Sequence, residues 1–321
     1  MAGTAEDIHL PGYPPRVIKL LKPLSKDPFV LQTARRLFED ESEVLNKLGS
    51  CDRVPKLFAH FEENQEFYFV QELIAGKDLS QEIIPGKPWN QNDVLNLLHD
   101  ILEVLSFVHQ QGVIHRDIKP SNLMRRQSDG KIVLIDFGAV KQIGTQLQNP
   151  QVPTSQTVPI GTEGYMPSEQ MNGYPKFASD IYAVGMVGIE ALTGVSPSQL
   201  SKDPNTLEVI WKNGVSVSVN LATILDKMVR YHYQDRYQGA EAALQDIKAI
   251  ISGSCSKTLV LPPPTKLNFL KVLSKLSLPV KLGISVISLG LVAVSIMAVA
   301  NRFYPTPQQN SPPVQTKKFK Y

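Results

Sequence analysis

The sequence of 321 residues predicts an α+β domain followed by one helix that crosses a membrane. Strand-like segments come first and helical segments follow within residues 1–252, an order typical of α+β proteins. Residues 282–300 contain no charge, and as a helix they would span the roughly 30 Å hydrocarbon core of a bilayer. Apolar residues make up 42% of the chain and charged residues 20%, which excludes a wholly disordered protein.

The periodicity of apolar residues predicts the elements of the domain in order. Alternating and β-branched residues indicate strands, and apolar residues three and four positions apart indicate helices. The expected elements are a strand over 16–21, a helix over 32–48, a strand over 66–73, a helix over 92–111, short strands around 131–137, and mostly helices up to about residue 252.

The C-terminal part of the chain differs from the rest in charge. From residue 256 onward there are nine Lys/Arg and no Asp or Glu, whereas 24 basic and 30 acidic residues precede them. We therefore expect 253–281 to be a basic juxtamembrane linker, or an amphipathic helix that rests on anionic lipid. Residues 282–300 are expected to be a transmembrane helix, with a buried core helix as the alternative, and 301–321 to be disordered.

The start of the chain does not have the pattern of a secretory signal, and so we expect a single-pass membrane protein whose residues 1–252 face the cytoplasm. The mildly acidic domain gives no reason to expect nucleic acid as a partner. Cys51 and Cys255 match no metal-ligand or disulfide spacing, which fits a reducing compartment.

The densest group of chemistry-bearing residues lies in VIHRDIKPSNLM, residues 113–124. Phosphoryl transfer needs a carboxylate that orients the attacking hydroxyl, a cation near the transferred phosphate and oxygen ligands for Mg²⁺. Asp117, Lys119 and Asn122 supply such groups within six residues. Asp136 follows in LIDFG and would be a second ligand of Mg²⁺.

With these motifs, residues 5–250 resemble the eukaryotic-like (Hanks-type) protein kinase family, specifically the bacterial Ser/Thr kinases anchored by a membrane helix, including a cyanobacterial branch. The resemblance implies a bilobal kinase fold, with an N-lobe over about 1–74 and a C-lobe over about 75–252. ATP and Mg²⁺ would bind between the lobes. Lys119, two positions after Asp117, matches the Ser/Thr pattern rather than the tyrosine pattern.

The resemblance also implies an ion pair that positions the phosphates of ATP. Val17-Ile18-Lys19 resembles the strand motif whose lysine contacts the α- and β-phosphates. Glu41 would be the partner of this lysine, because Leu45 and Leu48 then follow at the family's apolar spacing. The alternative for Glu41 is a place on a solvated acidic face.

The adenine ring would lie against the segment that joins the lobes. The resemblance places Gln71 at the gatekeeper position and the backbone from Glu72 to Ile74 beside adenine. Val17 and Met124 would sandwich the base.

Residues 161–169, GTEGYMPSE, resemble the substrate-docking loop and the element that follows it. Thr162 would lie in this loop, Glu169 would pair with Arg236, and Asp180 would bond to the backbone of the catalytic loop.

Five further residues have roles implied by the family. His115 and Phe137 would be packing residues, and Arg116, which precedes Asp117, marks kinases whose activation segment is ordered by phosphorylation. Thr154 and Thr157 are the leading candidates for this modification, although hydroxyls in such a loop also serve as solubilising groups.

The family pattern fails in front of Lys19. Only 18 residues precede this lysine, and they contain no glycine-rich GxGxxG loop; Ala5-Glu6-Asp7 resembles the end of the family's second strand. Two interpretations follow. Either the start of the chain is internal to a fuller kinase, or the chain is an N-terminally truncated kinase with weak or no catalysis.

The function that these observations predict is a membrane-anchored Ser/Thr protein kinase, with protein substrates and a homodimer for trans-autophosphorylation. A pseudokinase, a binding module with the kinase fold but no catalysis, is the alternative from another functional class. A small-molecule phosphotransferase shares the Asp, Asn and Asp pattern, but the docking loop over 161–169 argues against it.

Overall fold

The computed structural model describes residues 2–8, 10–23, 25–137 and 162–253. The chain divides into two compact units, Met1–Pro263 and Pro264–Tyr321, and all of the described residues belong to the first. Residues 254–281 of the expected linker, the expected span 282–300 and the tail 301–321 lie outside the described residues. Among the residues that are described, no helix is both long enough and apolar enough to cross a membrane.

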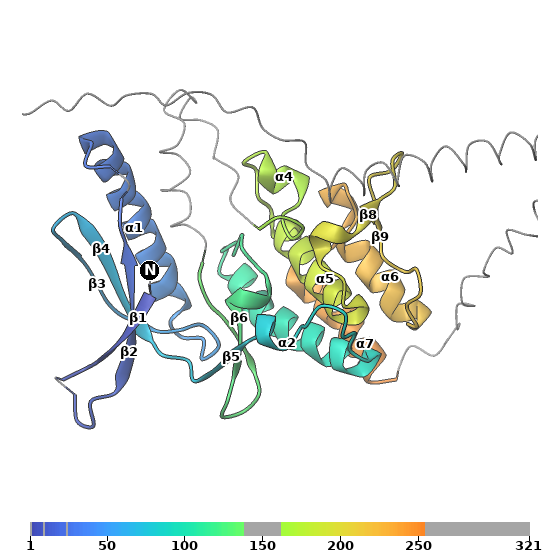
Figure 1. Cartoon of the computed structure of the whole chain (residues 1–321), viewed down its shortest axis with the longest axis horizontal. Coiled ribbons are helices and arrows are strands. Elements are labelled where there is room, and N and C mark those ends of the chain that lie inside the picture. Colours follow the sequence, from blue (N-terminus) through green and yellow to red (C-terminus); the bar gives the residue numbers. More distant parts are fainter. Residues whose placement is uncertain (1, 9, 24, 138–161, 254–321) are drawn as a thin grey trace, which may run out of the picture. The chain divides into compact units, whose positions relative to one another are not determined.

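The N-terminal lobe contains one antiparallel sheet with the strand order β1-β2-β4-β3 (Figure 1). Its strands are β1 (Ala2–Glu6), β2 (Pro15–Leu21), β3 (Leu57–Glu63) and β4 (Glu66–Glu72). Phe67 and Phe69 of β4 are fully buried on one face of the sheet, because alternate residues of a strand share a face. Their rings lie 5.1 and 4.5 Å from the ring of Phe38, so the helix that carries Phe38 packs on this face.

That helix, α1 (Pro28–Leu48), begins four residues before the predicted start at residue 32. The carboxylate of Asp27 accepts hydrogen bonds from the backbone N–H groups of Phe29 (2.9 Å) and Val30 (3.3 Å), which satisfies donors that a helix start leaves free. Proline is also favourable in the first turn, since it has no N–H to satisfy there. The cap therefore adds a turn that apolar periodicity did not indicate.

A small three-stranded sheet, β5-β6-β7, follows the N-terminal lobe, and its middle strand comes directly after residues 113–122. Its strands are β5 (Gly76–Asp78), β6 (Leu123–Arg126) and β7 (Ile132–Leu134). At Gly76 a Cβ atom would lie 2.0 Å from the carbonyl oxygen of Arg125. Only glycine allows β5 to approach β6 this closely.

Helices dominate the C-terminal lobe. They are α2 (Gln91–Gln110), α4 (Ser168–Met171), α5 (Phe177–Thr193), α6 (Val219–Met228) and α7 (Ala240–Ile251). Single 3₁₀ turns lie at Leu79–Gln81, Pro120–Asn122, Pro197–Gln199 and Tyr233–Asp235. A short hairpin of β8 (Ser201–Lys202) and β9 (Val209–Ile210) lies in the region where mostly helices were expected.

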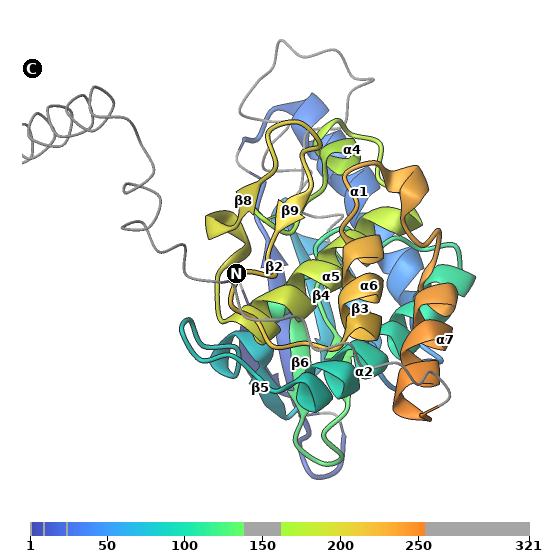
Figure 2. The ribbon, with the colours of Figure 1, turned by 90° about the vertical axis from the view of Figure 1, so that its right-hand side faces the viewer.

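The helix α5 is the centre of this lobe, because nearly all of its residues are buried. It packs against α2 and α6, and α7 packs against α2 and α6 in turn (Figures 1 and 2). Gly188 of α5 allows close packing, since a Cβ atom there would lie only 3.0 Å from the side chain of Leu98 and 3.1 Å from that of Leu225. The predicted α+β architecture, with strands first and helices later, is confirmed.

Candidate active site

Three charged side chains from separate elements meet between the two sheets. The ammonium nitrogen of Lys19 on β2 lies 3.1 Å from Oε1 of Glu41 on α1 and 2.8 Å from Oδ1 of Asp136, which follows β7. Asp136 has a φ of 65°, in the left-handed region that residues other than glycine seldom adopt. The structure therefore brings together the lysine, the glutamate and the aspartate that the sequence singled out.

Of the acidic residues on α1, Glu41 is the one that contacts Lys19. Glu41 is 1% exposed, whereas the side chain of Glu39 is 56% exposed. Burial raises the pKa of Glu41 to about 7, although the nearby charge of Lys19 acts in the opposite direction. Glu41 is thus not on a solvated face.

Lys19 stays charged in this environment. Burial acts to lower its pKa, but the carboxylates of Glu41 and Asp136 together outweigh that effect and raise the pKa above its ordinary value. A half-buried ammonium group flanked by two carboxylates is suited to bind the phosphates of a nucleotide, which would bring further negative charge.

Three side chains hold the carboxylate of Asp117 from several sides. Nδ2 of Asn122 donates to the backbone carbonyl (2.8 Å) and to Oδ2 (2.7 Å) of Asp117. Nζ of Lys119 lies 3.4 Å from Oδ2 of Asp117 and donates to the hydroxyl of Thr162 at 2.9 Å. That hydroxyl in turn donates to Oδ1 of Asp117 at 3.3 Å. The predicted docking-loop threonine therefore lies directly beside the predicted catalytic carboxylate.

Asp180 of α5 fixes the backbone that leads into Asp117. Its carboxylate accepts hydrogen bonds from the backbone N–H groups of His115 (2.8 Å) and Arg116 (2.9 Å), and it lies 3.0 Å from Nε2 of His109. Burial acts to raise the pKa of Asp180, but the hydrogen bond and charge of His109 outweigh it and lower the pKa overall. This arrangement holds Arg116 in the left-handed region, at a φ of 71°.

His115 is enclosed and packs against Phe137, with 4.6 Å between the ring centroids. Its Nδ1 accepts a hydrogen bond from the backbone N–H of Asp117 at 3.3 Å, and its Nε2 lies 3.2 Å from the carbonyl oxygen of Ile135. Both bonds form when the imidazole is neutral and carries its proton on Nε2. Burial favours the same state, since it lowers the pKa of His115. The geometry gives His115 a packing and spacing role.

Glu169 and Arg236 form a bidentate ion pair in the C-terminal lobe. The two distances are 2.7 Å and 3.2 Å, and Oε1 of Glu169 also accepts a hydrogen bond from the hydroxyl of Ser179 at 2.7 Å. The neighbouring Gln170 donates to the carbonyl oxygen of Arg116 at 2.6 Å. Sequence reasoning missed Ser179 and Gln170, because neither has a spacing that marks a site.

The residues expected around adenine come from both lobes. Val17 on β2 and Met124 on β6 are half-buried, and Ile74 is buried. The backbone N–H of Glu72 donates to the carbonyl oxygen of Lys56 at 2.9 Å, which ties the start of the connecting segment to the sheet. Thr154 and Thr157, the expected phosphorylation sites, lie outside the described residues.

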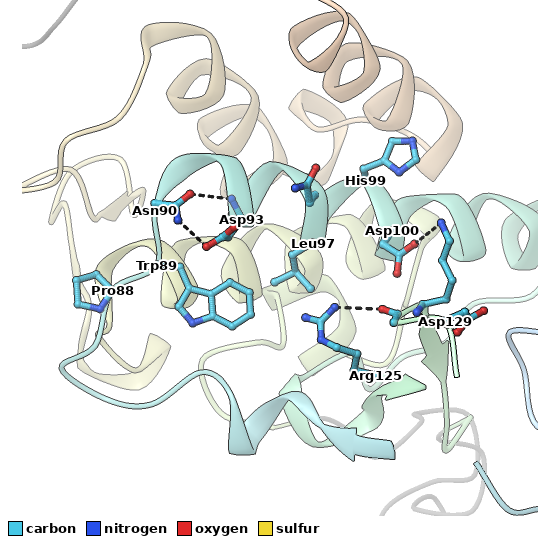
Figure 3. Close-up of a pocket in the computed structure, with 12 residues that line it drawn as sticks. Pro88, Trp89, Asn90, Asp93, Leu97, His99, Asp100, Arg125 and Asp129 are labelled. Atoms are coloured by element: carbon cyan, nitrogen blue, oxygen red, sulfur yellow. Dashed lines mark hydrogen bonds and ion pairs between the residues drawn. The ribbon is translucent and has the colours of Figure 1, made fainter. Parts of the chain in front are cut away.

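A cavity of about 760 Å³ lies away from these residues, between the N-terminal half of α2 and the hairpin of β6 and β7 (Figure 3). Trp89, Asp93, Asp100 and Arg125 are among the residues that line it, and none of the residues predicted for the nucleotide or the catalytic step does.

Comparison with known proteins agrees with this geometry. The protein kinase domain family matches residues 18–253, which is most of the chain. The chain belongs to this family. The kinase domain is 41% identical over 250 residues to "Serine/threonine-protein kinase C" of Synechocystis sp., covering 77% of this chain and 47% of that protein. It is 39% identical over 247 residues to "Serine/threonine-protein kinase PknA" of Nostoc sp., covering 76% of this chain and 44% of that protein.

The chain therefore spans about half the length of these cyanobacterial relatives. Among solved structures, the kinase domain of PknI from Mycobacterium tuberculosis matches with a TM-score of 0.53 and 20% identity, covering 76% of this chain and 88% of that one. This likeness confirms the bilobal kinase fold. The expected resemblance to Ser/Thr kinases with cyanobacterial relatives is confirmed as well.

Proposed function

We propose that this kinase domain transfers the γ-phosphoryl group of ATP to serine and threonine hydroxyls of protein substrates. The observation that carries the proposal is the convergence of two groups of side chains. Lys19 is held by Glu41 and Asp136, and Asp117 is held by Asn122 next to Lys119. Phosphoryl transfer depends on such positioning and on charge placed around the transferred group.

Each of these residues has a step that its chemistry suits. Asp117 orients the substrate hydroxyl and accepts its proton as the new oxygen–phosphorus bond forms. The bond between the γ-phosphorus and its bridging oxygen breaks, and ADP leaves with the electron pair of that bond. Lys119 stabilises the charge on the transferring phosphoryl group, and Lys19 positions the α- and β-phosphates.

Asn122 and Asp136 are the residues that would hold Mg²⁺, and their donor chemistry fits this ion. Both hydrogen bonds of Asn122 to Asp117 use its amide nitrogen, and so the amide oxygen is the atom that can bind a cation. Mg²⁺ is commonly held by one or two protein oxygens together with phosphate oxygens and water. When bound, it would neutralise negative charge on the phosphates.

The position of Thr162 supports hydroxyl amino acids as substrates. Its side chain accepts a hydrogen bond from Lys119 and donates one to Asp117, so the docking loop and the catalytic carboxylate share one small polar pocket. The identities of Lys119 and Thr162 both follow the Ser/Thr pattern of the family.

Phosphorylation of Thr154 or Thr157 is part of the proposal for regulation. Arg116 supports it, because its buried Nε has no hydrogen-bond partner among the described residues. A phosphate group would supply acceptor oxygens and a counter-charge for this guanidinium. Phosphopeptide mapping of active protein should find one of the two threonines modified; unmodified Thr154 and Thr157 in active material would refute the idea.

Membrane anchoring is a further part of the proposal. Its support is the uncharged run 282–300, which follows the lysines of 253–281. The kinase domain would then face the cytoplasm, where ATP is available, with anionic lipid and a second copy of the chain as partners. Protease added to intact cells should leave residues 1–252 intact. Recovery of the full chain in the soluble fraction would refute the anchor.

A pseudokinase is the second candidate. The contacts of Lys19 with Glu41 and Asp136 would also serve a domain that binds nucleotide without transferring phosphate.

One experiment separates the two candidates. The full chain is incubated with radiolabelled ATP, Mg²⁺ and a generic Ser/Thr substrate, beside the Asp117→Asn variant. A kinase gives label in the substrate that the variant loses by roughly 100-fold or more, in line with the effect of removing a catalytic carboxylate. Equal signals from both proteins, or none from either, would establish the pseudokinase instead.

A further inference from the structure

Arg53 is a buried arginine that connects the two lobes. It lies in the loop after α1, within the N-terminal lobe, and is only 7% exposed. Its Nε donates to the carbonyl oxygen of Ile132 on β7 at 2.9 Å, and its Nη1 donates to Glu103 on α2 at 2.7 Å. Its Nη2 donates to the carbonyl oxygen of Asp100 and lies 3.1 Å from the Asp100 carboxylate. We call Arg53, Asp100, Glu103 and Ile132 the Arg53 cluster.

The backbone of the same loop is attached to the C-terminal lobe as well. The N–H of Leu134 on β7 donates to the carbonyl oxygen of Arg53 at 3.0 Å. Arg126 on β6 donates to the carbonyl oxygen of Asp52 at 2.7 Å and to its carboxylate at 3.0 Å. The loop after α1 is therefore bonded to β6, β7 and α2 through side chains and backbone.

Asp100 ties the cluster together from the C-terminal lobe. Its carboxylate accepts hydrogen bonds from the backbone N–H of Ile132 (2.6 Å) and from Lys131 (3.2 Å), so one side chain holds both β7 and Arg53. Figure 3 shows Asp100 on α2 beside the hairpin of β6 and β7. Since β7 is bonded to Asp100 and to Arg53, the spacing of β7 from the loop after α1 is fixed.

The two elements that the cluster joins are those that carry the carboxylates around Lys19. Glu41 lies on α1, about 10 Å along the helix axis from its last residue at 1.5 Å per residue. Asp136 lies two residues beyond the end of β7. Both carboxylates contact the ammonium group of Lys19, at 3.1 and 2.8 Å. The Arg53 cluster closes a ring of contacts through α1, Glu41, Lys19, Asp136 and β7.

We propose that Arg53 is a positioning residue for phosphoryl transfer, because it fixes the distance between the elements that present Glu41 and Asp136 to Lys19. This inference rests on the proposed kinase function and assigns a new role at the same site. Arg53 touches neither carboxylate; it acts through the end of α1 and through β7. Without it, the loop after α1 would lose the side-chain bonds of Arg53 to α2 and β7. Glu41 would then be held less firmly at one distance from Asp136.

The test compares three variants of the full chain. Arg53→Met removes the guanidinium and keeps an unbranched side chain, and Arg53→Lys keeps the charge but loses the planar set of donors. Arg35→Met is the matched control. Arg35 lies on α1 and forms a bidentate pair with Glu62 at 2.7 and 2.6 Å, but this pair is exposed and stays within the N-terminal lobe.

Two measurements are made on each variant. The first is amide hydrogen exchange, compared for peptides from the C-terminal half of α1, from residues 132–137 and from α5. The second is steady-state kinetics with separate KM values for ATP and for the protein substrate. If Arg53 had a purely structural role, its replacement would only reduce the fraction of folded protein. Amide exchange near Lys19, compared with that in α5, would then stay the same, and so would the kinetic constants per folded molecule.

For Arg53→Met we expect faster amide exchange in α1 and in residues 132–137, with unchanged exchange in α5. We also expect kcat/KM for ATP to fall by roughly 10- to 100-fold, the scale expected when a reacting group is misplaced by about 1 Å. KM for the protein substrate should not change. Arg53→Lys should show a smaller effect in the same direction, and Arg35→Met should match the unmodified chain.

Unchanged exchange near Lys19 and unchanged kinetics for ATP in folded Arg53→Met would overturn the proposal, as would an equal effect from Arg35→Met. If Arg53→Met does not fold, the same criteria applied to Arg53→Lys decide. If the unmodified chain transfers no phosphate, the proposed function fails while the exchange pattern still tests the positioning role.

Discussion

Replacement of Arg236 by methionine tests the energetics of the docking loop most directly. Arg236 is 3% exposed, and its guanidinium makes five hydrogen bonds. Two of them reach Glu169, and the others reach the backbone carbonyls of Ala178, Arg230 and Tyr231. The side chain also lies over the ring of Tyr182, with 4.8 Å to the centroid. The substitution Arg236→Met would remove all of these bonds and keep much of the apolar volume.

The expected loss of stability follows from the charge of Glu169, which stays buried after the substitution. The Glu169 side chain is 8% exposed, and after the change its charge would be buried with only the hydroxyl of Ser179 as a hydrogen-bond partner from this network. Breaking a buried ion pair by removing one partner costs about 3–5 kcal/mol, whereas an exposed pair contributes about 0–1 kcal/mol. Arg35→Met, which breaks the exposed pair with Glu62, should therefore be the milder change by about 3 kcal/mol.

The assay is urea unfolding followed by tryptophan fluorescence. Both tryptophans of the chain, Trp89 and Trp211, lie in the C-terminal lobe, so the signal reports the lobe that contains the ion pair. The midpoint should shift to lower urea with an unchanged slope, which indicates a change in stability rather than in the surface exposed.

Two results would refute this reasoning. The first is a loss of less than about 1 kcal/mol for Arg236→Met, since that would place the pair in the range of exposed ones. The second concerns the double variant Arg236→Met with Glu169→Gln. Because this variant leaves no buried charge unpaired, it should be more stable than Arg236→Met alone, and a lower stability would contradict the role assigned to Glu169.

Three further predictions concern activity and the docking loop. Burial raises the pKa of Glu41 to about 7, so this carboxyl group is neutral below that pH and charged above it. The value of kcat/KM for ATP should therefore rise between about pH 6 and 8. In the Glu41→Gln variant, kcat/KM should be low and should lack this rise. Thr162→Ala should lower kcat by roughly 10-fold, because it removes the hydroxyl between Lys119 and the carboxylate of Asp117. Thr162→Ser keeps the hydroxyl and should keep most of the rate. Equal losses for the two variants in steady-state assays would contradict this prediction. Gly164→Ala should destabilise the domain by about 1–3 kcal/mol in urea unfolding, because this residue has a φ of 87° and its Cβ would lie 2.7 Å from Cβ of Pro197; unchanged stability would show that the docking loop can move away.

Local sequence was sufficient to predict the groups that lie close together along the chain. Asp117, Lys119 and Asn122 fall within six residues, and their contacts form within one loop and one 3₁₀ turn. The strand 16–21 and the helix 92–111 were likewise predicted within one residue of their observed ends, since apolar periodicity reflects which face of an element is buried. The start of α1 was missed, because the cap formed by Asp27 depends on one hydrogen-bonding side chain and not on periodicity.

Some contacts between distant segments were predicted only through the family resemblance, as with Glu41 and Lys19. The periodicity of α1 limits which of its residues are buried, and the arrangement of β2 and α1 places Glu41 3.1 Å from Lys19 while the side chain of Glu39 is 56% exposed. Arg53 carries no motif, and its role depends on partners 47 to 79 residues away. A buried guanidinium requires several acceptors at once, and those acceptors lie on α2 and β7, which only the packing of the two lobes brings to the end of α1.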